Sequence, residues 1–122
     1  MKILFAEDDE LLRSSLEFYL TNNGYSVTAV SNGLEVKEKL KNETFDLIIT
    51  DLNMPFFGGM EVINFVRNEL KSAAPIIVLT SFGIEKAELD AFEIGASEFV
   101  SKPFSPSILK ARIEKLLKRQ VK

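Results

Sequence analysis

Short apolar runs alternate along the chain with longer segments in which apolar residues recur every three or four positions. The short runs predict five β-strands, at residues 3–6, 25–30, 47–50, 75–79 and 98–100. The longer segments predict five helices, at residues 11–20, 32–40, 60–70, 84–94 and from 106 onward. A strand followed by a helix, repeated in this way, is typical of an α/β domain with a parallel sheet.

The predicted elements also have recognisable ends and cores. Ser105-Pro106 places a hydroxyl and then a proline at the start of the last helix, which is the preferred order at a helix N-terminus. The candidate core residues of the helix at 60–70 are Val62, Ile63, Val66 and Leu70. Because crossovers between parallel strands are right-handed, we expect helices on both faces of the sheet. The functional crevice of such a sheet lies at the carboxyl ends of its strands.

The amino-acid composition limits the kinds of site that can form at this edge of the sheet. The 122 residues suit one domain, and they include neither cysteine nor histidine. Disulfides, thiolate sites and imidazole ligands are therefore excluded, so any metal must be held by oxygen, which favours magnesium, manganese or calcium. The net charge of −3 argues against nucleic-acid binding, and no apolar stretch reaches the roughly 18 residues of a membrane span. We expect a cytoplasmic protein that binds neither nucleic acid nor membrane.

Polar side chains follow four of the predicted strands. They are Glu7, Asp8 and Asp9 after the first, Asp51 after the third, Thr80 and Ser81 after the fourth, and Ser101, Lys102 and Pro103 after the fifth. Clustered carboxylates repel one another, and a divalent cation offsets that repulsion. An aspartate can attack phosphorus to form an acyl phosphate, while a metal, a lysine and a hydroxyl stabilise the phosphoryl oxygens. The pattern therefore favours phosphoryl chemistry at this edge.

Four motifs, each at the end of a predicted strand, carry a family resemblance. They are ILFAEDDE at 3–10, DLNMPFFGG at 51–59, VLTS at 78–81 and SKPFSP at 101–106. In this order they resemble the receiver domain of bacterial two-component response regulators, over essentially the whole chain. The resemblance implies a flavodoxin-like, doubly wound (βα)5 fold with a five-stranded parallel sheet in the order 2-1-3-4-5. It also implies a single domain over residues 1–122 that acts as a signalling phosphoacceptor rather than as an enzyme.

The same resemblance implies a phosphorylation site with a metal beside it. Asp51 is similar to the phosphoacceptor of the family. Asp8 matches the direct ligand of Mg²⁺ (or Mn²⁺), and Glu7 matches the acid that holds the metal through water. Asp51 and the backbone carbonyl of Asn53 would complete the metal shell. Asp9 is a third acid, which we interpret as the N-cap of the first helix rather than as a ligand.

Three further residues match the family's switching machinery. Thr80 and Lys102 match its hydroxyl and lysine, and Phe99 matches its aromatic switch position. By this resemblance Thr80 moves toward the phosphoryl group and Phe99 fills the vacated space, which reshapes the face made by the fourth helix, fifth strand and last helix. The Lys102–Pro103 peptide is similar to one that is cis in the family. Gly58 stands where an aspartate is common, so we expect a flexible loop there.

The expected partner is a sensor histidine kinase or a phosphotransfer protein, because the chain has no histidine to donate the phosphoryl group. KPFSP at 102–106 followed by Ala111-Arg112-Ile113 resembles the winged-helix transcription-factor branch of response regulators. Receivers of that branch dimerise through the switch face, so we expect a phosphorylation-promoted homodimer. The candidate interface residues are Glu98, Arg112 and Arg119. A stand-alone receiver and one part of a longer protein are both compatible with the sequence.

Other interpretations compete with this one. A pseudo-receiver would bind partners without phosphorylation, although the complete set of acids, hydroxyl and lysine argues against it. A flavodoxin-like cofactor binder needs a phosphate loop where this chain has three acids. A phosphohydrolase usually carries its nucleophilic aspartate after the first strand. Phe56 and Phe57 either form an exposed docking surface or tuck under the loops, and Phe82 is hypothesised to restrict the hydrolytic water.

Overall fold

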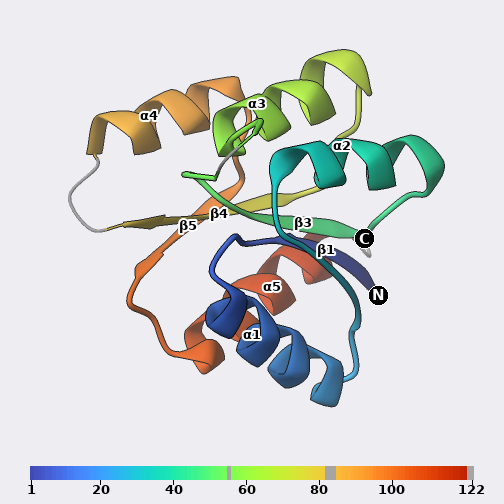
Figure 1. Cartoon of the computed structure of the whole chain (residues 1–122), viewed down its shortest axis with the longest axis vertical. Coiled ribbons are helices and arrows are strands. Elements are labelled where there is room, and N and C mark those ends of the chain that lie inside the picture. The colour runs from blue at the N-terminus through green and yellow to red at the C-terminus, as the bar shows by residue number, and fades with distance from the viewer. Residues whose placement is uncertain (55, 82–84, 121–122) are drawn as a thin grey trace.

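The computed structural model describes residues 1–54, 56–81 and 85–120. Within these residues, parallel strands form one five-stranded sheet in the order β2-β1-β3-β4-β5 (Figure 1). The strands are β1 (Lys2–Ala6), β2 (Ser26–Val30), β3 (Leu47–Asp51), β4 (Ile76–Ser81) and β5 (Glu98–Lys102). This is the flavodoxin-like strand order, so the predicted fold class is confirmed.

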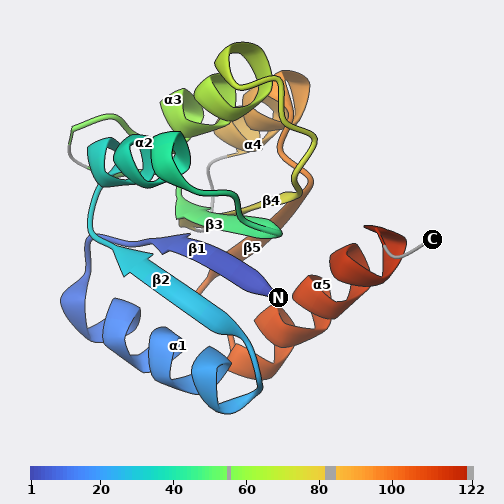
Figure 2. The same ribbon diagram turned by 90° about the vertical axis from the view of Figure 1, so that its right-hand side faces the viewer.

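Helices cover both faces of this sheet. They are α1 (Glu10–Asn22), α2 (Gly33–Asn42), α3 (Gly59–Asn64) with the π-helical turn η1 (Phe65–Glu69), α4 (Glu85–Ile94) and α5 (Pro106–Gln120). α1 and α5 lie on one face, and α2, α3 and α4 lie on the other (Figures 1 and 2). None of the helices that the structure describes combines the length and apolar composition needed to cross a bilayer.

The sheet separates two apolar layers, because successive residues of a strand point to opposite faces. In β1, Leu4 belongs to the layer under α2, α3 and α4, whereas Ile3 and Phe5 belong to the layer under α1 and α5. β3 and β4 are buried along their apolar lengths, as expected for central strands covered on both sides. Each layer is therefore a separate hydrophobic core.

Local signals place the helix ends as the sequence predicts. The Asp9 side chain accepts hydrogen bonds from the backbone N–H groups of Leu11 and Leu12, at 3.0 and 3.2 Å, which confirms it as the N-cap of α1. α5 begins at Pro106, as its proline predicts. These caps fix where the chain leaves the strand ends that carry the polar residues.

Two strands are longer than their apolar runs predict. β4 continues through Thr80 and Ser81, and β5 continues through Ser101 and Lys102, where Thr80 pairs with Ser101 and Ser81 with Lys102. The backbone ladder does not depend on side-chain polarity, so hydrophobic pattern alone ends these strands too early. Thr80 and Lys102 therefore belong to paired strands rather than to loops.

The predicted helix at 60–70 is only partly correct. The chain is α-helical to Asn64 and then forms the π-turn, in which the Leu70 N–H donates to the Phe65 carbonyl at 2.9 Å. Leu70 is 38% exposed, so its prediction as a core residue is wrong. The wider turn shifts the residues that follow around the helix axis, and a 3.6-residue pattern does not register that shift.

Arg67, on this π-turn, ties together segments at the amino-terminal end of the sheet. Its guanidinium donates to the carbonyls of Gly95, Ser72 and Ala74, at 3.0, 2.9 and 2.7 Å. Gly95 has φ +122, and a Cβ there would come within 2.7 Å of the Arg67 side chain. One side chain thus satisfies carbonyls at the end of α4 and in the segment that leads into β4.

We predict that Arg67→Met lowers the free energy of unfolding by about 2–3 kcal/mol, because it removes a charged donor and leaves several carbonyls without a partner. Urea denaturation measures this loss as a lower midpoint with an unchanged m-value. Lys39→Met, an exposed lysine of α2, is the control and should change stability by less than about 0.5 kcal/mol. Equal midpoints for the two variants would contradict this role of Arg67.

Candidate functional site

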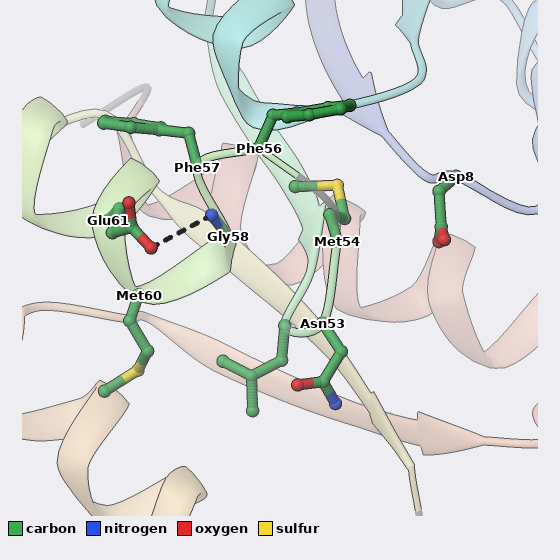
Figure 3. Close-up of a pocket in the computed structure, with 9 residues that line it drawn as sticks. Asp8, Asn53, Met54, Phe56, Phe57, Gly58, Met60 and Glu61 are labelled. Carbon is green, nitrogen blue, oxygen red and sulfur yellow. Dashed lines mark hydrogen bonds between the residues drawn. The ribbon is translucent and has the colours of Figure 1, made fainter.

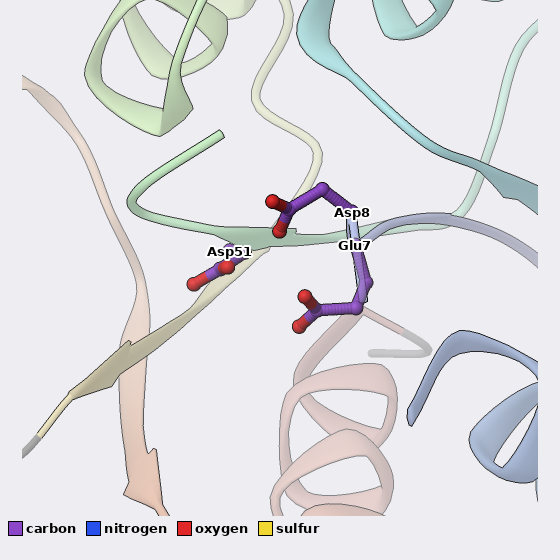
Figure 4. A group of neighbouring side chains, drawn as sticks. All are labelled: Glu7, Asp8 and Asp51. Carbon is purple, nitrogen blue, oxygen red and sulfur yellow. The ribbon is translucent and has the colours of Figure 1, made fainter. Parts of the chain in front are cut away.

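Three carboxylates meet at the carboxyl ends of β1 and β3 (Figure 4). Glu7 and Asp8 directly follow β1, and Asp51 is the last residue of β3. Each offers one carboxylate oxygen that lies within 4.8 Å of the other two. Glu7 and Asp51 are buried, whereas Asp8 is exposed. The central position of β1 and β3 in the sheet explains why residues distant in sequence meet here.

Lys102 reaches the same cluster from the end of β5. Its Nζ lies 2.8 Å from Glu7 Oε1 and 3.2 Å from Asp51 Oδ2. The sequence-predicted group of Glu7, Asp8, Asp51 and Lys102 is therefore assembled in one place. The Lys102–Pro103 peptide is cis, as the family resemblance implies.

Glu7 has hydrogen-bond partners at both carboxylate oxygens. Oε1 accepts from Lys102, and Oε2 accepts from the backbone N–H of Asp9 at 3.0 Å. The Glu7 main chain is held as well, by its N–H to the Val30 carbonyl at 3.1 Å and its carbonyl to Arg13 Nη1 at 2.8 Å. Both carboxylate oxygens of Glu7 thus have partners, while Asp8 is exposed at the edge of the cluster.

The electrostatics of the cluster follow from burial. Loss of solvent raises the pKa of Asp51; the Lys102 charge opposes that rise, and the Asp8 carboxylate adds to it. Burial also raises the pKa of Glu7, against the hydrogen bond from Lys102. For Lys102 itself, burial disfavours the charged form, but the two carboxylates outweigh it and raise the pKa of the ammonium group. The cluster therefore holds a charged lysine and an excess of carboxylate, which an additional cation would stabilise.

The donor set fits a hard divalent cation. The cluster offers carboxylate oxygens, and the chain contains no histidine or cysteine to attract softer metals. Asp8 and Asn53 line a cavity of about 520 Å³ beside the cluster, together with Met54, Phe56 and Phe57 (Figure 3). The site therefore has both oxygen ligands and an open approach from solvent.

The segment after Asp51 is closely packed against β3. A Cβ at Gly59 would lie 2.6 Å from the Asp51 carbonyl, so only glycine fits at the start of α3. The rings of Phe56 and Phe57 point away from each other (Figure 3). Phe57 packs against the core, as the tucked alternative predicts, whereas Phe56 is 71% exposed and a docking role for it stays a prediction.

The predicted switch residues lie on β4 and β5, beside the acidic cluster. Thr80 is buried, one position beyond Leu79, which pairs with Asp51. Phe99 is half-buried, and its ring lies edge-on to Phe92 of α4 with centroids 4.5 Å apart. Phe99, a residue of β5, therefore packs against α4 through Phe92.

The candidate interface residues, and Phe82, are placed by the structure only in part. Glu98 and Arg112 form an ion pair within the chain, with Oε1 and Nη1 3.9 Å apart. The Arg119 side chain and Phe82 lie outside the part of the chain that the structure describes at side-chain level. Sequence reasoning missed Arg13, whose hydrogen bond to the Glu7 carbonyl joins α1 to the site. A lone arginine six residues after the acid gives no local signal of that contact.

Comparisons with known proteins show the family of this chain. The family model of the response regulator receiver domain matches residues 3–114. Response regulator RR06 of Streptococcus pneumoniae is 37% identical over 98% of this chain and 54% of its own length. Transcriptional regulatory protein ResD of Bacillus subtilis is 38% identical over 97% of this chain and 48% of its own. The chain thus spans about half the length of these relatives.

Solved structures of receiver domains and response regulators have the same fold. The receiver domain of Francisella response regulator 1452 superposes with a TM-score of 0.90 at 25% identity, over 98% of each chain. Chemotaxis response regulator CheY4 of Vibrio cholerae superposes with a TM-score of 0.87 at 28% identity, over 94% of this chain and 97% of that one. The sheet order, the clustered acids with their lysine, and these matches lead to one conclusion: the chain belongs to the family of response regulator receiver domains of two-component systems.

Proposed function

We propose that Asp51 is the phosphoacceptor of this receiver domain. The observation that carries the proposal is the position of Lys102, whose ammonium group lies 3.2 Å from Asp51 Oδ2 while it also contacts Glu7. A carboxylate with a cation beside it and a second acid next to it has the neighbours that phosphoryl transfer needs. Because the acids, the hydroxyl of Thr80 and the lysine are all present, a pseudo-receiver that works without phosphorylation is the weaker alternative.

In the proposed reaction, an Asp51 carboxylate oxygen attacks the phosphorus of a phosphohistidine on a kinase or phosphotransfer protein. A P–O bond to Asp51 forms, the P–N bond breaks, and the leaving imidazole takes up a proton. Lys102 would exchange its contact with Asp51 for a phosphoryl oxygen, and Thr80 would donate its hydroxyl to another. The protein's contribution is positioning and charge stabilisation rather than turnover of a free substrate.

Asp8, Asp51 and the backbone carbonyl of Asn53 are the proposed ligands of Mg²⁺ or Mn²⁺. Such an ion, when bound, supplies positive charge to the phosphoryl oxygens. Glu7 already accepts a hydrogen bond at each carboxylate oxygen, which supports an indirect role through water. Asp8 is exposed beside the cavity and is the acid best placed for direct contact.

We further propose that phosphorylation acts on the face of α4, β5 and α5, through Phe99. In the whole protein this face would control an output domain, which the resemblance of residues 102–113 suggests is of the winged-helix type. The ResD relative is named as a transcriptional regulatory protein. We expect that protein to work in the cytoplasm and this domain, over 1–122, to make no direct contact with nucleic acid.

We predict that acetyl phosphate with magnesium adds one phosphoryl group to the protein, detected by intact-mass spectrometry. Asp51→Asn should add none, because its amide is not a nucleophile. Lys102→Met should react about 100-fold more slowly, since it removes one stabilising charge. Lys110→Met, a lysine of α5 away from the cluster, is the control and should react at the wild-type rate. A phosphoryl group retained in Asp51→Asn would overturn the assignment.

We also predict that beryllofluoride with magnesium converts the protein from monomer to dimer in light scattering. Arg112→Glu should weaken that dimer about tenfold, because it reverses the charge of a candidate interface residue on the switch face. Lys41→Glu makes the same charge change on α2 and should leave the dimer intact. A monomer in both states would remove the dimer from the proposal while leaving phosphorylation at Asp51 unaffected.

A further inference from the structure

The loop between β3 and α3 has an unusual backbone. Phe56 and Phe57 both have positive φ, at 50° and 73°, a region that residues other than glycine rarely adopt. Such a conformation persists only where the surrounding structure holds it. Asn53, a proposed metal ligand, lies in the same connection, four residues before Phe57.

Helix α2 contacts this loop at two points, one turn apart. At its first residue, the Gly33 backbone lies so close to the loop that a Cβ would overlap the Phe57 carbonyl, at 1.6 Å. Four residues later, Lys37 Nζ lies 5.4 Å from the centroid of the Phe57 ring and 5.3 Å from that of the Phe65 ring. Both distances are within the range of a cation–π contact.

The two rings also contact each other. Phe57 and Phe65 meet edge to face with centroids 6.4 Å apart and planes at 80°. Phe65 is buried at the start of the π-turn, so its ring is held in place by the surrounding core. The ammonium group of Lys37 therefore holds the ring of Phe57, a loop residue, against a rigid element of the core.

Lys37 differs from the other lysines of its helix. Lys39 and Lys41 are exposed to solvent, whereas Lys37 is half-buried over the rings of Phe57 and Phe65. Among the residues that the structure describes, Lys37 has no carboxylate within 4.0 Å. Solubility or an ion pair does not explain this placement, but a structural role toward the loop does.

We propose that Lys37 is a positioning residue that fixes the β3–α3 loop through Phe57 and so raises the affinity of the acidic cluster for a divalent cation. The inference rests on the proposed metal site, and it adds a residue of α2 that touches neither the cation nor the phosphoryl group. When the contact is lost, the loop samples other conformations, and the Asn53 carbonyl is in place for a smaller fraction of the time.

The sign of the effect separates this proposal from simple electrostatics. Removing a positive charge near a cluster of acids strengthens cation binding if charge alone matters. Removing the contact between Lys37 and Phe57 weakens cation binding if loop position matters. Lys37→Gln therefore gives opposite results under the two explanations.

The test is isothermal titration of the whole chain with magnesium chloride. We expect Lys37→Gln to weaken magnesium binding by about threefold, the scale of one cation–π contact. Lys37→Arg keeps a cation over the rings and should bind as the wild type does. Lys39→Gln removes the same charge from the same helix without touching an aromatic ring, and it should bind magnesium as tightly as the wild type or more tightly.

A double-mutant cycle shows whether the effect passes through the ring. In a Phe57→Leu background, Lys37→Gln should have no further effect on magnesium affinity. The contact between Lys37 and the Phe57 ring, through which Lys37 acts on the loop, is already absent there. Hydrogen exchange at the amides of residues 56–59 should accelerate in both single variants, which a purely electrostatic change would not produce. Urea denaturation confirms that each variant is folded.

The outcomes are distinguishable from failure of the proposed function. If the wild type does not bind magnesium, the proposed metal site is wrong and this inference falls with it. If the wild type binds magnesium and Lys37→Gln binds it equally or more tightly, the metal site stands and Lys37 has no positioning role. Additive effects of Lys37→Gln and Phe57→Leu would likewise overturn the proposal.

Discussion

The contact of one ammonium group with two buried carboxylates is the interaction on which the site depends. Lys102 joins Glu7 to Asp51, and these residues lie at the carboxyl ends of three different strands. Without that cation, burial would favour neutral acids, and a protonated aspartate is a poor nucleophile. The contact thus opposes the rise in the pKa of Asp51 that burial causes, and it links the edge strand β5 to the centre of the sheet.

Much of this arrangement is predictable from sequence, because it follows from periodicity and strand polarity. Alternating apolar runs and helical patterns give the order of elements, and parallel strands bring Glu7, Asp51 and Lys102 to one edge. The strand ends are less predictable, since Thr80 and Lys102 continue a backbone ladder that does not require apolar side chains. The π-turn after Asn64 is invisible to a 3.6-residue pattern for a related reason.

The side-chain contacts between separate elements are the part that sequence does not reveal. Arg13, Lys37 and Arg67 look like ordinary surface cations of helices, yet each reaches a carbonyl or an aromatic ring of another element. Their partners are set by how the helices lie on the sheet, and that depends on packing across the whole domain. Roles of this kind require coordinates.

The separation of the apolar interior by the sheet has a mechanical consequence. α2, α3, α4 and Phe99 share one layer, α1 and α5 share the other, and the sheet lies between the two. Side chains can therefore repack beneath α4 without disturbing the contacts between α1 and the opposite face. A sequence can diversify on either side almost independently, provided that the shared edge with its acids and lysine is preserved.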